Sequence, residues 1–242
     1  MDGNVVGMRN RFSSQAYLQA ALAPARWLAL RELVETDPDE EQLARVAGEH
    51  VPLLVGLLRR AGATSRTPES RPQDARECVT RLGRNAARLQ LHALLQLIPA
   101  RLDAALEDRV AACRSAGDQL LSQLANEELP IQPVDRTLLL LLQWIPFLVR
   151  LQGGEEPTLD QLGQWLLEGI GGRGTLHPQL TEALEACASP DTHPDPAGRR
   201  GALLRAAWQL AGMERSSLRV EPALISRLGL RASGHAAGSP RG

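Results

Sequence analysis

Apolar residues recur along most of this chain at steps of three and four, the spacing of an α-helix that buries one face. The clearest stripe crosses residues 101–125 and consists of Leu102, Leu106, Val110, Cys113, Gly117, Leu120 and Leu124. No stretch alternates apolar and polar positions with the period of two that marks a half-buried strand. Leucine and alanine dominate, whereas strand-favouring residues are sparse. The pattern predicts an all-α fold.

Proline, glycine and polar loops divide this pattern into a series of helices. Asp37 is expected to cap the second helix, with Pro38 at its first position. The segment 63–72, rich in Ser, Thr, Arg and Pro, is predicted to be a mobile loop. The helices are expected over 16–35 with a candidate break at Pro24, from Pro38 onward, from Pro52 to near Gly62, over 73–97 with a break near Gly83, and over 101–125, 136–151, 158–169, 177–187 and 198–212.

The length of 242 residues suits one generous domain. We expect a flexible N-terminus over 1–15, a single compact multi-helix domain over 16–215, and a short helix with a disordered tail over 216–242. The longest apolar run, Leu138–Leu151, falls short of the roughly 20 residues that cross a bilayer, so it predicts a buried core helix and no membrane partner. The N-terminus lacks the apolar stretch of a signal peptide. These features predict a cytoplasmic protein.

The amino-acid composition excludes several classes of chemistry. All 27 cationic residues are arginine, and without lysine both Schiff-base chemistry and a Walker A phosphate loop are excluded. The formal net charge of −1 provides no basic field for nucleic acid, and seven aromatic residues offer little for base stacking. We therefore expect no nucleic-acid partner.

Two local patterns contain residue types that bind cofactors or metals elsewhere. Residues 169–174 match the Gly-rich dinucleotide pattern, but a predicted helix precedes them where that loop needs a strand, so they indicate a turn between helices and no cofactor. Metal-capable side chains gather late in the chain, at His177, Cys187, Asp191, His193 and Asp195, with spacings that match no usual zinc site. We predict no metal and no catalytic residues. His50 and His92 lie in predicted helices and are interpreted as core-edge or surface residues.

Arg81, Arg84 and Arg88 are spaced along one predicted helical face. This spacing has two interpretations. The first is an ordinary solvated surface, and the second is a candidate interaction or anion-binding face.

The order of the segments over 16–212 resembles the HDOD family. The residues that carry the resemblance are Leu28–Leu33, Asp37-Pro38, Glu41-Gln42-Leu43-Ala44, Pro52–Ala61, Ala75–Arg84, Thr137–Leu151 and Thr192-His193-Pro194. The resemblance implies an all-helical relative of the HD phosphohydrolases, of a kind found in bacterial signalling proteins and acting as an interaction or output module.

Departures from the family and its catalytic relatives also matter. The family's Asn-Ser is missing, because the chain reads Arg60-Ala61-Gly62-Ala63. Where an active HD enzyme carries His-Asp in the core helix, this chain has Gln143-Trp144, and the 101–125 helix offers Asp108-Arg109 where a first histidine is expected. An amide and an indole cannot replace imidazole and carboxylate metal ligands. A metal-activated water is therefore not expected.

The function that follows is a non-catalytic bacterial signal-transduction domain that acts through a protein partner, such as a sensor kinase, a response regulator or a cyclic-dinucleotide enzyme. Two alternatives remain open. One is a sensor of a nucleotide second messenger, with a pocket near Trp144 and the face of Arg84 and Arg88. The other is a divergent metal-dependent phosphohydrolase that uses His177, His193 and nearby acids.

Overall fold

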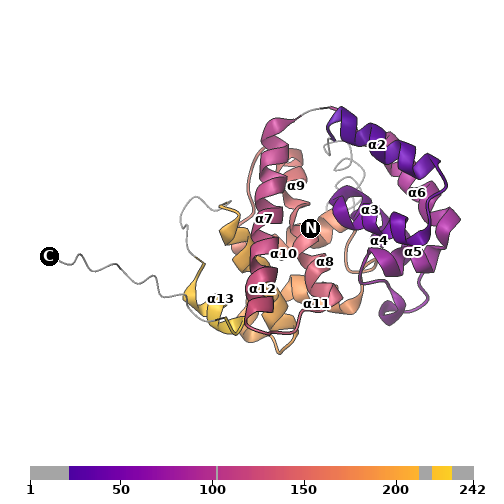
Figure 1. Cartoon of the computed structure of the whole chain (residues 1–242). Coiled ribbons are helices and arrows are strands. Elements are labelled where there is room, and N and C mark those ends of the chain that lie inside the picture. Colours follow the sequence, from indigo (N-terminus) through magenta and orange to yellow (C-terminus); the bar gives the residue numbers. More distant parts are fainter. Residues whose placement is uncertain (1–21, 102, 213–219, 231–242) are drawn as a thin grey trace, which may run out of the picture.

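A computed structural model describes residues 22–101, 103–212 and 220–230, and over these ranges the protein is all-α, as predicted (Figure 1). The α-helices are α2 (Pro24–Glu35), α3 (Glu40–Glu49), α4 (Val51–Ala63), α5 (Ala75–Leu82), α6 (Arg84–Leu97), α7 (Ala104–Asn126), α8 (Pro133–Leu142), α9 (Ile145–Leu151), α10 (Leu159–Ile170), α11 (Pro178–Ala186), α12 (Ala197–Leu210) and α13 (Pro222–Arg227). Short 3₁₀ turns, η1 (Pro68–Ser70) and η2 (Pro190–Thr192), lie between them. The predictions for 1–15, for the start of the first helix and for the tail beyond 230 fall outside the described residues.

The helices form two groups that share one hydrophobic core. Helices α2–α6 lie together at one side and α7–α13 at the other, and α4 contacts α8 between them (Figure 1). In the first group, α2 packs on α6, and the Trp27 indole Nε1 donates to the carbonyls of Leu95 and Ile98, each at 3.0 Å. In the second group, α12 packs against α7, α8, α10, α11 and α13, and its Trp208 is fully buried.

The predicted stripe on the 101–125 segment is confirmed by α7. Leu106, Cys113, Gly117, Leu120 and Leu124 are buried, and Val110 is half-buried. Leu102 lies outside the described residues. Gly83 separates α5 from α6 with a φ of 78°, a left-handed conformation that favours glycine, so the predicted break is also confirmed.

The start of α3 differs from the sequence prediction. The N-cap of α3 is Asp39 and not Asp37: the Asp39 side chain accepts from the Gln42 N–H at 2.8 Å, and the Gln42 side chain accepts from the Asp39 N–H at 3.0 Å. These reciprocal bonds form a capping box. Asp37 instead has a φ of 62° and pairs with Arg84 and Arg88, so its carboxylate serves a tertiary contact.

The predicted core helix over 136–151 is two helices, α8 and α9, because the helix is interrupted at Gln143 and Trp144. Pro146 has no N–H to donate to the preceding turn, and a proline inside a helix disrupts that turn. The N–H groups of Gln143 and Trp144 bond three residues back, to Leu140 and Leu141, which is the tighter 3₁₀ pattern. The segment is buried as predicted, and no helix in the described part of the chain is long and apolar enough to cross a membrane.

Candidate functional site

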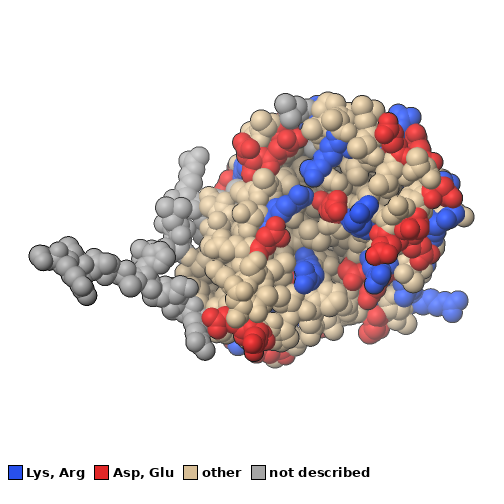
Figure 2. All heavy atoms as spheres, in the orientation of Figure 1, with Lys and Arg blue, Asp and Glu red and all other residues tan. Residues whose placement is uncertain are grey.

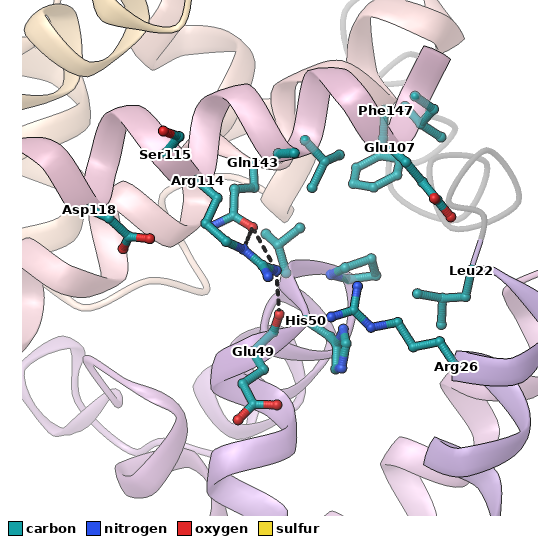
Figure 3. Close-up of a pocket in the computed structure, with 15 residues that line it drawn as sticks. Leu22, Arg26, Glu49, His50, Glu107, Arg114, Ser115, Asp118, Gln143 and Phe147 are labelled. Atoms are coloured by element: carbon teal, nitrogen blue, oxygen red, sulfur yellow. Dashed lines mark hydrogen bonds between the residues drawn. The ribbon is translucent and has the colours of Figure 1, made fainter. Parts of the chain in front are cut away.

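A pocket of about 440 Å³ opens between the two helical groups (Figure 3). The start of α2, the junction of α3 and α4, one face of α7 and the break between α8 and α9 line it. Its apolar lining is Leu22, Val51, Pro52, Leu106, Val110, Ala111 and Phe147, and its polar lining is Arg26, Glu49, His50, Glu107, Arg114, Ser115, Asp118 and Gln143. Such a mixture of apolar wall and convergent polar groups is typical of small-molecule sites.

Local sequence explains how the central polar groups reach the pocket. His50 ends α3 and caps α4, because Val51-Pro52 begins a new helix immediately after it. Gln143 occupies the break that Pro146 imposes, and its side chain turns into the pocket wall while the residue stays only 2% exposed. Arg114 projects from α7 beside the buried stripe.

Arg114 connects the two helical groups across the pocket. Its Nη2 donates to the Glu49 carbonyl at 2.9 Å, and its Nε and Nη2 both approach Oε1 of Gln143 at 3.4 Å (Figure 3). These bonds hold the guanidinium at the wall without neutralising it, because both acceptors are uncharged.

His50 lies below Arg26 and Arg114 in the same view and is 6% exposed (Figure 3). Burial, and after it the positive charges of Arg26 and Arg114, lowers the pKa of His50 from 6.5 to about 4. The imidazole is therefore neutral at pH 7, and it can both donate and accept a hydrogen bond there.

This pKa predicts a pH-dependent stability that can be assigned to His50. Because the pKa in the folded chain lies below that of the unfolded chain, neutral His50 stabilises the fold above pH 6.5, and this contribution is lost as the pH falls toward 4. Between about pH 6.5 and pH 4.5, the wild type should lose about 2 kcal/mol more than His50→Gln in urea unfolding. Parallel pH dependences of the two proteins would contradict the buried, neutral state of His50.

The predicted arginine face is divided between two helices and partly paired. Arg81 belongs to α5, whereas Arg84 and Arg88 belong to α6 and reach the Asp37 carboxylate at 3.0 Å and 3.4 Å. Trp144 is fully buried, and its indole Nε1 donates to the Gly169 carbonyl at 3.3 Å. Neither Trp144 nor the two α6 arginines line the pocket, which lies instead beside the neighbouring Gln143.

The metal-capable residues late in the chain make ordinary structural contacts. The His177 ring caps α11 by accepting from the Gln179 N–H at 3.2 Å, and it contacts the Gln73 amide. Burial lowers the pKa of His177 and raises that of the Cys187 thiol to about 12. His193 lies 3.0 Å from the Ser189 carbonyl. No three His, Cys, Asp or Glu side chains come together as a metal site within the described ranges.

The remaining sequence motif has a structural role. The Gly-rich segment 169–174 begins with the last two residues of helix α10, whose C-cap is Gly171 in a left-handed conformation, and leads toward α11. It is therefore the interhelical turn that the sequence predicted. Charged side chains of both signs are interspersed over the face seen in Figure 2, and few lie on the left of its middle part.

Sequence reasoning missed the pocket, because Arg26 and Arg114 belong to no motif and His50 was interpreted as a core-edge or surface residue. The nearest signal is Gln143, a polar residue that interrupts the apolar run Leu138–Leu151. In comparisons with family models, with curated proteins and with solved structures, nothing matches this chain.

Proposed function

We propose that this chain is a non-catalytic regulatory domain that binds a small molecule in the pocket between its two helical groups. The pocket itself carries the proposal: it joins a continuous apolar wall to three convergent nitrogen-bearing side chains, Arg26, His50 and Arg114. This composition suits recognition of one ligand in one orientation.

The polar groups of the pocket favour binding over catalysis. A histidine that activates a hydroxyl must lie within hydrogen-bond reach of it. His50 and Ser115 both line the pocket, but among the described contacts no hydrogen bond joins them. The depressed pKa of His50 also makes it a weak base at neutral pH.

The location of the pocket supports a regulatory role. Ligand atoms placed there would contact α2 and the α3–α4 junction on one side and α7 and Gln143 on the other. A ligand that binds one arrangement of the two groups better than another shifts the population toward it. Transmission to a signalling protein, whether a sensor kinase, a response regulator or a cyclic-dinucleotide enzyme, is the part of the proposal that rests on the resemblance to HDOD domains.

A bulky side chain in the pocket tests the proposal. Ala111 lines the pocket on the exposed side of α7, so Ala111→Trp should fill part of the cavity without disturbing the core. In a thermal-shift screen of small molecules, compounds near 100-fold above their Kd should stabilise the wild type by about 2.7 kcal/mol, and Ala111→Trp should abolish that gain.

Ala125→Trp is the matched control, because Ala125 is exposed on the same helix and does not line the pocket. It should respond to ligands like the wild type. A screen without stabilising compounds, or compounds whose effect survives Ala111→Trp, would contradict the proposed function.

A further inference from the structure

We propose that the ligand of this pocket is a small organic acid, with its carboxylate between Arg26 and Arg114 and its aliphatic or single-ring body on the apolar wall. This inference rests on the proposed function and adds the chemical class of the ligand.

The proposal rests first on the positive charges of Arg26 and Arg114. Neither Arg26 nor Arg114 forms an ion pair with a carboxylate of a described residue, although arginines elsewhere do, among them Arg109 with Glu156 and Arg205 with Asp160. In Figure 3 both guanidinium groups point toward the middle of the pocket, above His50. Two like charges that converge on one cavity repel each other, and an anion placed between them relieves the repulsion.

The acidic lining residues do not occupy this position. The Glu49 carboxylate points away from Arg114, and Asp118 and Glu107 lie at opposite edges of the group (Figure 3). The two arginines are also the charged groups that act on His50, where both lower its pKa and no carboxylate raises it. The centre of the pocket is therefore positive, and its rim carries the acids.

The charges at the rim of the pocket also favour a singly charged anion over a doubly charged one. Three carboxylates border the pocket, on Glu49, Glu107 and Asp118. A doubly charged phosphate would meet more repulsion from them than a carboxylate with a single charge. A carboxylate also matches the planar fork of a guanidinium.

One of the two arginines is already oriented for this contact. The Nε and Nη2 atoms of Arg114 are held by Gln143 and by the Glu49 carbonyl, while its Nη1 donates to no described residue. Arg26 lies in the first turn of α2 and is exposed, with no described acceptor. A fixed donor on one side and a mobile donor on the other can hold a carboxylate without reorganising the wall.

The apolar wall determines the body of the ligand. Leu22, Val51, Leu106 and Val110 are aliphatic, and Phe147 is the single aromatic residue of the lining. Nucleobases are normally held by stacking on aromatic side chains. The wall therefore favours an alkyl chain or one ring over a cyclic dinucleotide.

Calorimetric titration with octanoate, octanamide, octyl phosphate and a cyclic dinucleotide tests the inference. Octanoate should bind about tenfold more tightly than the uncharged amide, because a hydrogen bond to a charged group is the stronger kind. Shortening the acid to hexanoate should weaken binding about fourfold for each CH₂ removed. Octyl phosphate and the dinucleotide should bind more weakly than octanoate.

Arg26→Gln is the decisive variant, because Arg26 is exposed and its loss should leave the fold intact. It should weaken octanoate about tenfold and leave octanamide unchanged. Arg45→Gln, which removes an exposed arginine of α3 outside the pocket, should change neither. Equal affinity for acid and amide, or an Arg26→Gln variant that binds octanoate normally, would overturn the acid class. The proposed function would survive that result if Ala111→Trp still blocked a neutral ligand, and it would fail with the inference if no ligand bound in the pocket.

Discussion

Replacing Asp135 by alanine should lower the free energy of unfolding by about 3–5 kcal/mol, because it leaves a buried arginine without its counter-charge. The Arg200 Nε lies 3.0 Å from Asp135 Oδ1, and the two side chains are 4% and 3% exposed. Arg200 also donates to the side-chain oxygens of Gln179 and Gln132. These neutral acceptors cannot replace the carboxylate, so the charge would remain in the core between α8 and α12.

Asp135 also caps a helix, and the experiment must separate this role from the ion pair. Its Oδ2 accepts from the Gln132 N–H at 2.8 Å, which caps the start of α8 and is worth about 1 kcal/mol. The double variant Arg200→Met/Asp135→Leu removes the cap and both charges together. It should recover most of the stability lost in Asp135→Ala, because apolar replacements of a buried pair are often neutral. Urea unfolding at pH 7 measures all three proteins, and a loss below about 1 kcal/mol in Asp135→Ala would contradict a buried ion pair.

The helices of this protein could be predicted from sequence because their burial is periodic. The stripe from Leu106 to Leu124 has a single buried face along α7, and its spacing alone fixes that face. The start of α3 could not be chosen in the same way. Asp37 and Asp39 are both acceptable caps, and the choice depends on Arg84 and Arg88 of α6, which hold the Asp37 carboxylate.

The pocket was beyond sequence reasoning for a related reason. Arg26, His50 and Arg114 come from three separate elements, and only the packing of the two helical groups brings them to one cavity. The Pro146 break was visible as a proline in the apolar run, yet the consequence for Gln143, a buried amide facing Arg114, depends on the neighbouring helix. Distant residues without a motif leave no local signal.

The contact between the two helical groups leaves no room for a side chain at Gly62. Gly62→Ala should therefore lower the free energy of unfolding by about 3 kcal/mol or more. The sequence predicts that the helix ends near this glycine, and α4 ends one residue later, at Ala63. A methyl group on Gly62 would lie 1.9 Å from the Thr175 carbonyl oxygen, which belongs to the other helical group. A backbone atom cannot rotate away as a side chain can, so the end of α4 would have to separate from the turn before α11.

Gly48→Ala provides the comparison within the same group of helices. A methyl group there would lie 4.0 Å from its nearest neighbour, the Ala75 Cβ, which is ordinary contact. With no clash, alanine should stabilise α3 by about 0.5–1 kcal/mol through its higher helix propensity. The two substitutions add the same atom and should change the free energy of urea unfolding in opposite directions. If Gly62→Ala were also stabilising, the close approach of α4 to Thr175 would be wrong. The hydrogen bonds from Arg71 Nη1 to the Arg173 and Leu176 carbonyls, which cross this same junction, would then have to be longer as well.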